Sequence, residues 1–211
     1  MISLLKKDFY NLRSYLKTIL ILVVFFTLLG FLKIEMYDSS FLSGMLIIIF
    51  TMIPIASFTY DLQSKWDAFC QTLPVTRKEI VLGKYILSLL TIGIGFVLSF
   101  IMNIVYSLWM KEPVDISMII SSNGMVSAVG IIIQSIILPL IYKFGVEKGR
   151  IILIIVCLAP TFLFMSLGEG VMGKLAQWDW QVISYASPVF ALGIMFLSYN
   201  ISYKIYNAKD F

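Results

Sequence analysis

The sequence has few of the residues that enzymes and metal sites use. It contains no histidine, and only two of its 211 residues are cysteines. Cys70 falls in a polar stretch and Cys157 in an apolar run, so neither is placed for an extracellular disulfide, and two thiols make no zinc framework. No acidic pair falls at the centre of an apolar run. We find no candidate general base, metal site or activated nucleophile, and therefore predict a non-catalytic chain without a cofactor of its own.

Charged residues are scarce as well. They make up 13% of the chain, whereas 60% is hydrophobic, and the mean hydropathy is +0.94. A soluble domain is about 25% charged and roughly 45–50% apolar. Apolar runs of about 20 residues, enough to cross a hydrocarbon core, recur along the sequence. We therefore predict an all-α membrane protein that forms one transmembrane domain, residues 1–211.

The apolar runs and the charges between them predict a topology. We expect six spans, at Thr18–Glu35, Phe41–Tyr60, Gly83–Trp109, Asn123–Tyr142, Ile151–Leu167 and Ile183–Tyr203. With both termini in the cytoplasm, 13 of the 16 Lys and Arg residues lie inside, whereas the 12 Asp and Glu residues divide evenly. A bias in basic residues alone is what the positive-inside rule expects. The net charge of +4 is thus a membrane-surface feature, and we expect no nucleic-acid partner.

Residues 1–17 precede the first span and have an amphipathic pattern. Apolar residues at helical spacing make one stripe, which consists of Ile2, Leu5, Phe9, Leu12 and Leu16. Leu4 lies off this stripe. The pattern predicts a helix that lies on the membrane surface and buries the stripe.

The longest polar interruption is the stretch from Asp61 to Lys84, between the second and third spans. At 100° per residue, one side of a helix collects Leu62, Trp66, Phe69, Cys70 and Leu73. Pro74 ends this helix because it lacks an N–H. Thr76 and Glu79 then have the spacing of a capping box, which predicts that the next helix begins there and continues into the third span.

The pattern of this short helix allows two interpretations. It either covers the membrane surface at the ends of its own spans or docks onto a soluble partner. A helix that rests on lipid usually carries several Lys and Arg residues on its polar face. Here Lys65 is the only basic residue, which favours a protein partner.

Polar residues within the spans are few. Asn103 and Gln134 are the clearest near mid-span, and no charge lies at a span centre, where one costs at least ~2.5–3.5 kcal/mol. Amides in spans more often form inter-helix hydrogen bonds, worth ~0.6–2 kcal/mol, than line a substrate path, so we favour the inter-helix role. Kinks or breaks within the spans are predicted at Pro54, Pro139, Pro160 and Pro188. Between the fifth and sixth spans, helical spacing over 171–182 predicts either a short outer helix or an aromatic belt.

Four features together resemble the membrane subunit of ABC-2 type exporters in its short, six-span form. They are the amphipathic "elbow" at 1–17, the loop Asp61-Leu-Gln-Ser-Lys-Trp-Asp-Ala-Phe69 with Leu73-Pro-Val-Thr-Arg-Lys-Glu-Ile-Val-Leu-Gly-Lys84, the six spans with both ends inside, and the outer segment. The loop is the specific feature. It is similar to permeases of the phenol-soluble-modulin exporter type and of peptide-antibiotic exporters.

The resemblance implies partners and a mechanism. It implies a separate cytosolic ABC ATPase that binds ATP and magnesium, and a second permease, identical or paralogous, in a bacterial plasma membrane. It also implies that residues 61–82 form a cytosolic coupling loop with a coupling helix that sits in the ATPase. The apolar residues that would seat this helix in the ATPase are Leu62, Trp66, Phe69 and Leu73. The polar residues that would surround them are Asp61, Lys65 and Asp67. An uncharged interior suits export of an amphipathic or hydrophobic substrate, such as a peptide or an antibiotic.

Two other functions remain open from the sequence. The substrate-binding subunit of an energy-coupling-factor vitamin importer has a similar size and span number, and the tryptophans Trp178 and Trp180 would suit its ligand site. A membrane scaffold or immunity protein would transport nothing. Binding of an ATPase would separate the exporter from the scaffold, and tight binding of a vitamin would favour the importer.

Overall fold

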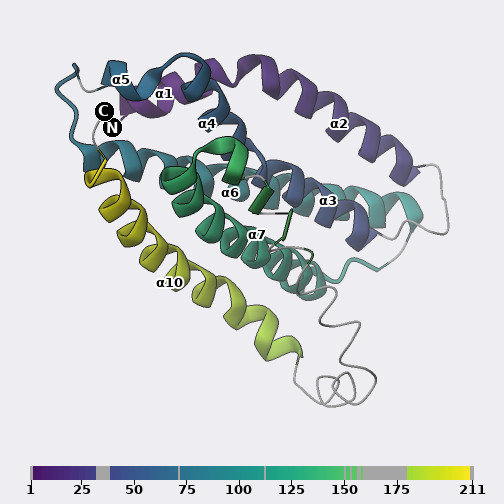
Figure 1. Ribbon diagram of the computed structural model, residues 1–211. Coiled ribbons are helices and arrows are strands. Elements are labelled where there is room, and N and C mark those ends of the chain that lie inside the picture. The colour runs from purple at the N-terminus through teal and green to yellow at the C-terminus, as the bar shows by residue number, and fades with distance from the viewer. Residues whose placement is uncertain are drawn as a thin grey trace.

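The computed structural model describes residues 2–31, 39–70, 72–111, 113–149, 151–152, 154–155, 158 and 180–209. These residues form helices and no strand. The labelled helices are α1 (Ile2–Asn11), α2 (Arg13–Phe31), α3 (Ser39–Thr51), α4 (Ile53–Gln63), α5 (Trp66–Cys70), α6 (Arg77–Met110), α7 (Ile116–Phe144) and α10 (Trp180–Asn207) (Figure 1).

Within the described residues, four helical segments are long and apolar enough to cross a membrane. They are Ser43–Gln63, Arg77–Met110, Ile116–Phe144 and Val182–Asn207, which correspond to the second, third, fourth and sixth predicted spans. A fifth is obtained if Ser3–Asn11 and Tyr15–Leu28, which meet at 64°, are counted as one bent span. Most of the fifth predicted span and most of the outer segment at 171–182 lie outside the described residues, so six spans remain a prediction.

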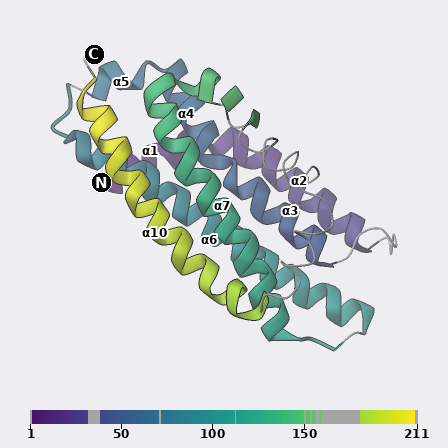
Figure 2. The same cartoon turned by 60° about the horizontal axis from the view of Figure 1, so that its bottom comes forward.

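The core of the bundle is built from α3, α6, α7 and α10. α7 and α10 pack along one another, and α3 lies against both α6 and α7 (Figure 2). Two glycines permit the close approach of α3. A Cβ atom at Gly95 of α6 would lie 2.9 Å from the Phe50 Cβ atom, and one at Gly130 of α7 would lie 2.8 Å from the Thr51 Oγ1 atom. Small residues are the usual means by which membrane helices pack closely.

The helix of the second span is interrupted next to Pro54, at Met52, whereas α7 and α10 continue through Pro139 and Pro188. α3 ends at Thr51, and α4 begins at Ile53 with Pro54 in its first turn. The buried amide of Gln134, on α7, donates a hydrogen bond to the Thr51 carbonyl at this interruption, which links α7 to the end of α3. Asn103 differs, because its amide donates to the Ser99 carbonyl of its own helix, 3.1 Å away.

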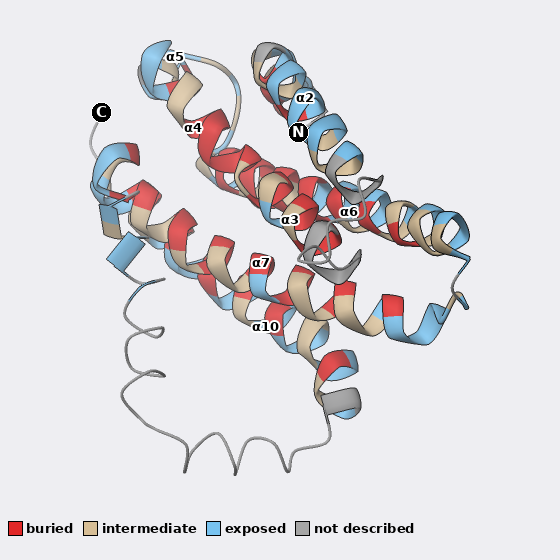
Figure 3. Ribbon diagram, turned by 90° about the vertical axis from the view of Figure 1, so that its right-hand side faces the viewer, coloured by how far each residue is buried: buried red, intermediate tan, exposed pale blue. Residues whose placement is uncertain are grey.

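The outer surfaces of the helices are apolar, as lipid contact requires. Figure 3 shows buried residues concentrated on α3, α4 and α7, whereas α2 is mainly exposed or intermediate. Exposed large side chains on α2 include Ile21, Val24 and Leu28. An apolar surface of this extent is rare on soluble monomers. The fold, like the composition, is that of a multi-pass membrane protein.

The amphipathic start of the chain is helical, and part of the predicted stripe is buried: Leu12 lies in a core cluster, and Leu5 and Leu16 pack against it. Leu4, Asp8 and Leu12 are 8%, 2% and 0% exposed, whereas Phe9 is 37% exposed. Leu4 packs toward Gly83, where an added Cβ atom would lie 3.9 Å from the Leu4 Cβ atom. Burial of Leu4, off the stripe, and of Asp8 was not predicted; α1 turns Asp8, its single acidic residue, to charged partners inside the bundle.

Both chain ends lie at one end of the bundle, which we call the α5 end. The start of α1, the end of α10 and helix α5 meet there (Figure 1). The same end contains the break between α4 and α5 and the start of α6. The polar stretch of the sequence is therefore gathered with the first and last helices into one region.

Candidate functional site

The polar stretch begins in the last turn of α4. This helix does not continue to Leu73, although the sequence pattern predicted that it would. α4 ends at Gln63, and the Ser64 hydroxyl donates to the Tyr60 carbonyl, 2.9 Å away. Lys65 has a φ of 50°, a left-handed conformation that side-chain-bearing residues rarely adopt. The prediction of one continuous helix from Leu62 to Leu73 is therefore wrong: the chain turns at Lys65, and α5 is a separate helix of five residues.

The end of the stretch follows the prediction. The Thr76 side chain accepts a hydrogen bond from the Glu79 backbone N–H, 3.3 Å away, and the Thr76 N–H donates to the Glu79 carboxylate, 3.0 Å away. This is a complete capping box, and α6 begins at Arg77 directly after it. The predicted start of the helix that continues into the third span is confirmed.

The turn at Lys65 redistributes the apolar residues of the stretch. Leu62 and Phe69 are 58% and 56% exposed, Trp66 and Leu73 are half-buried, and Cys70 is 1% exposed. Two of the predicted seating residues thus face outward, and Trp66 lies at their edge with its ring 5.6 Å from that of Phe69. α4 and α5 together present a small apolar surface at the α5 end.

Four charged residues meet under this surface, and we call them the ion quartet: Lys7, Asp8, Asp61 and Lys84. The Lys7 Nζ atom lies 2.6 Å from the Asp61 Oδ1 atom and 3.0 Å from the Asp8 Oδ1 atom. The Lys84 Nζ atom lies 2.5 Å from the Asp61 Oδ2 atom and 3.0 Å from the Asp8 Oδ1 atom. Each lysine contacts both carboxylates, so two positive and two negative charges balance.

The quartet is buried. The side chains of Lys7, Asp8, Asp61 and Lys84 are 19%, 4%, 8% and 5% exposed. Buried charges are tolerated when they are paired and hydrogen-bonded, and removing one partner of a buried pair costs about 3–5 kcal/mol. The Lys84 ammonium also donates to the Ser57 hydroxyl, 2.6 Å away. These contacts join α1, α4 and α6.

One member of the quartet reaches the short helix directly. The Lys7 Nζ atom lies 4.0 Å from the centre of the Trp66 ring. A cation over an indole face is worth about 0.5–1 kcal/mol at an exposed site and ~2 kcal/mol when desolvated. Lys7 thus connects α1 to α5 as well as to Asp61.

The sequence indicated only part of this arrangement. Asp61 was expected at the exposed rim of the coupling helix, but the residue is 7% exposed, because its carboxylate neutralises two buried lysines. Lys7, Asp8 and Lys84 were not singled out. The signal available for Asp8 was its spacing of four from both Leu4 and Leu12, which places a charge on an otherwise apolar helix face.

The end of α10 supports α5 from the other side. The Tyr206 hydroxyl lies 3.7 Å from the Cys70 Sγ atom and donates to the Asp67 Oδ1 atom, 3.5 Å away. Arg77 donates to the Asn207 and Lys209 carbonyls, at 2.7 and 3.0 Å, which satisfies the free carbonyl groups at the end of α10. The start of α6 is therefore tied to the last turn of the chain.

Burial affects two titratable groups of α5. It raises the pKa of the Cys70 thiol, which keeps this side chain uncharged. It also raises the pKa of the Asp67 carboxyl, an effect that the nearby Lys209 ammonium partly offsets. Asp67 is exposed as a residue, but its carboxylate faces the buried Tyr206 hydroxyl rather than open water.

A cavity of about 110 Å³ lies behind α5. Its walls include Phe58 of α4, Trp66 of α5 and Tyr142 of α7, and it reaches Asp61 and Lys84 of the quartet. α5 is thus held by specific contacts at its two ends and is not packed tightly against the bundle along its length.

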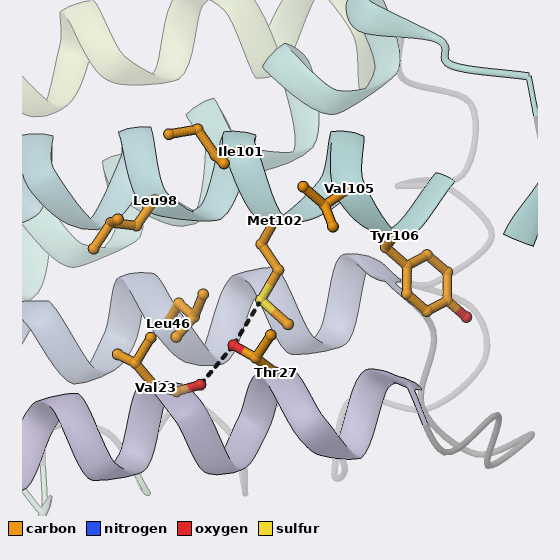
Figure 4. Close-up of a pocket in the computed structure, with 8 residues that line it drawn as sticks. All are labelled: Val23, Thr27, Leu46, Leu98, Ile101, Met102, Val105 and Tyr106. Carbon is orange, nitrogen blue, oxygen red and sulfur yellow. Dashed lines mark hydrogen bonds between the residues drawn. The ribbon is translucent and has the colours of Figure 1, made fainter. Parts of the chain in front are cut away.

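A second pocket, apolar and of about 210 Å³, lies among α2, α3 and α6 (Figure 4). It is lined by Val23, Thr27, Leu46, Leu98, Ile101, Met102, Val105 and Tyr106. The Thr27 hydroxyl donates to the Val23 carbonyl, 2.7 Å away, and lies 3.9 Å from the Met102 sulfur, so it is satisfied within the wall. The pocket offers an apolar surface to a ligand. Asn103 and Gln134 do not line it.

The fold and these two regions define a class: a helical membrane protein with a small exposed apolar surface at one end and an apolar pocket between its helices. The comparisons give the family. A family model described as ABC-2 family transporter protein matches residues 3–207. The chain belongs to this family, and it is accordingly a membrane permease of an ABC transporter, whose family implies an ABC ATPase as partner. Comparison with curated proteins and with solved structures gave no match.

Proposed function

We propose that this chain is the permease of an ATP-driven exporter and that α4 and α5 form the surface on which its ATPase docks. The observation that carries this is the exposure of Leu62 and Phe69, at 58% and 56%, at the end of the bundle that also contains both chain ends. Exposed apolar side chains clustered at one place mark sites of interaction with other proteins.

The surroundings of the two residues fit a soluble partner. Gln63, Lys65 and Asp67 are exposed around them, which makes a polar rim about an apolar centre. Trp66, at the edge, contributes part of its surface while its ring remains under Lys7. Under the expected topology, with the termini in the cytoplasm, this surface faces the cytosol, where an ATPase would meet it.

The cargo we propose is an amphipathic or hydrophobic molecule, such as a peptide or an antibiotic, that leaves the cell through a pair of permeases. The pocket in Figure 4 supports this class of cargo, because six of its eight lining side chains are apolar and the hydroxyl of Thr27 is already bonded within the wall, while Tyr106 adds one hydroxyl. The second permease is an identical copy or a paralogue. Membership in the ABC-2 family favours this function over a vitamin-importer subunit, and ATP-coupled transport separates it from a scaffold or immunity protein.

The test is the effect of a charge on the docking surface. Leu62→Asp and Phe69→Asp should each weaken recovery of the ABC ATPase with the tagged permease by roughly thirtyfold, since truncating an interface anchor often costs ~2 kcal/mol or more. Peptide-stimulated ATP hydrolysis in reconstituted vesicles should be lost in both variants. Insertion into the membrane should be unchanged.

The matched control is Gln63→Asp, which places the same charge next to Leu62 but outside the apolar centre. It should retain both ATPase recovery and stimulated hydrolysis. Normal recovery and normal stimulation in both Leu62→Asp and Phe69→Asp would exclude α4 and α5 as the docking surface.

A further inference from the structure

α5 is too short to hold its own position. It has five residues, and isolated helices shorter than about 12 residues are marginal in water because nucleation costs more than a single turn recovers. It follows Lys65, whose left-handed conformation ends α4 and permits a change of direction. The placement of Phe69, which α5 presents outward, must therefore come from contacts that α5 makes with the rest of the bundle.

At the start of α5, the contact that holds it is a cation over a ring. Trp66 is half-buried, and the Lys7 Nζ atom lies 4.0 Å from the centre of its indole ring. At the other end, Cys70 is 1% exposed and lies 3.7 Å from the Tyr206 hydroxyl. The cavity of about 110 Å³, which Trp66 and Asp67 of α5 line, leaves room for α5 to shift if either contact is lost.

Lys7 is itself fixed by the ion quartet. Its ammonium lies 2.6 Å from Asp61 at the end of α4, and both carboxylates of the quartet also contact Lys84 in the second turn of α6. A displacement of Trp66 therefore acts on Lys7, and through Asp61 and Lys84 on the helices that begin and end beside α5. A contiguous set of buried contacts of this kind can couple a movement of α5 to the membrane spans that contain α4 and α6.

We propose that α1 acts as a brace for the ATPase-docking surface and that Lys7 is its positioning residue. Lys7 holds Trp66, and with it α5, in the orientation that presents Phe69, and the ion quartet passes the position of α5 to α4 and α6. This inference rests on the proposed function of α5 as the docking helix. It assigns to the N-terminal helix a role in ATPase affinity in addition to any contact with lipid.

The first test uses the permease alone. Lys7→Met keeps the length of the side chain and removes the charge that lies over Trp66. We expect hydrogen–deuterium exchange of the Trp66–Cys70 amides to become at least about tenfold faster in the purified permease, while α7 keeps its wild-type protection. Lys7→Arg should restore wild-type exchange, because it keeps the cation. The matched control is Lys6→Met, an exposed position on the same helix, which should leave exchange of α5 unchanged.

A second variant covers the case in which Lys7→Met does not fold. Trp66→Leu removes the ring and leaves all four ion pairs of the quartet intact, and it should accelerate exchange of the α5 amides in the same way. Wild-type exchange of α5 in a folded Lys7→Met permease, or in Trp66→Leu if Lys7→Met does not fold, would overturn the brace.

The ATPase provides a second readout. Lys7→Met should bind the ABC ATPase that co-purifies with the wild type about tenfold more weakly, although Leu62 and Phe69 are unchanged, and saturating ATPase should restore binding. Lys7→Arg should bind normally. Faster exchange of α5 together with wild-type ATPase affinity would overturn the positioning role. Failure of the wild-type permease to bind any ABC ATPase would refute the proposed function, and the exchange result would still decide whether α1 braces α5.

Discussion

At the scale of single residues, Lys84 is the side chain with the most buried polar contacts in the ion quartet. Its ammonium contacts Asp8, Asp61 and Ser57, and its side chain is only 5% exposed. A buried lysine in a membrane protein is costly unless it is paired, and here two carboxylates and a hydroxyl share the pairing. The quartet is stable because its charges balance, so its members should be replaceable together but not singly.

We predict that Lys84→Met lowers the stability of the folded permease by about 3–5 kcal/mol, because Asp8 and Asp61 are left with one lysine between them. The double variant Lys84→Met, Asp8→Asn keeps the Lys7–Asp61 pair and restores neutrality, so it should regain much of the loss. Thermal unfolding of the solubilised permease measures both. Lys78→Met, on an exposed position of the same helix, is the control. A wild-type melting temperature for Lys84→Met would show that the quartet contributes little.

The sequence predicted contacts between residues that are close along the chain but not contacts between distant ones. The capping box of Thr76 and Glu79 was predicted correctly because its partners are three residues apart, and local geometry alone brings them together. Asp8 and Lys84 are 76 residues apart, and no local pattern pairs them. The same holds for Lys7 and Trp66, whose contact depends on how α1 folds back over α4.

At the scale of helices, the packing of α3 against α6 depends on a glycine. A Cβ atom at Gly95 would lie 2.9 Å from the Phe50 Cβ atom and 3.4 Å from the Ile47 Cα atom, and neither can move without moving the helix. Two residues earlier, a Cβ atom at Gly93 would meet nothing within 4 Å. The two glycines of one helix therefore provide a matched pair.

We predict that Gly95→Ala destabilises the permease by about 1–3 kcal/mol, the usual cost of overpacking. Gly93→Ala should be neutral or slightly stabilising, since alanine is favoured over glycine within a helix by about 0.5–1 kcal/mol. Melting temperatures of the two variants in one detergent measure the difference. Equal melting temperatures would mean that α3 does not approach α6 as closely as the structure has it.

Helix positions were predicted better than helix ends. Length and hydropathy located the second, third, fourth and sixth spans, and Pro54 located the break between α3 and α4. The turn at Lys65 was missed because a calculation at 100° per residue assumes that the helix continues, and nothing in Lys65 itself signals a left-handed conformation. The burial of Asp8 on α1 was missed because an apolar pattern does not show which charged residue will find partners inside the bundle.

At the scale of the whole molecule, the chain ends and the polar stretch form one functional end of the bundle. α1 reaches this end through the ion quartet, α10 through Tyr206 and Arg77, and α4 and α5 form its surface. The spans extend away from it and enclose the apolar pocket between α2, α3 and α6 (Figure 4). Under the proposed function, the ATPase docks at this end and the cargo meets the spans, which is the arrangement that a permease driven by a separate ATPase requires.

The central claim is that α5 contacts the ATPase, and site-specific photocrosslinking tests it most directly. A benzophenone amino acid in place of Phe69 should, on irradiation of the assembled transporter, give one product that contains both the permease and the ABC ATPase. The same amino acid in place of Phe190, which is 69% exposed in the first half of α10, is the control and should give none. An ATPase that co-purifies with the permease but crosslinks from Phe190 and not from Phe69 would contradict the account.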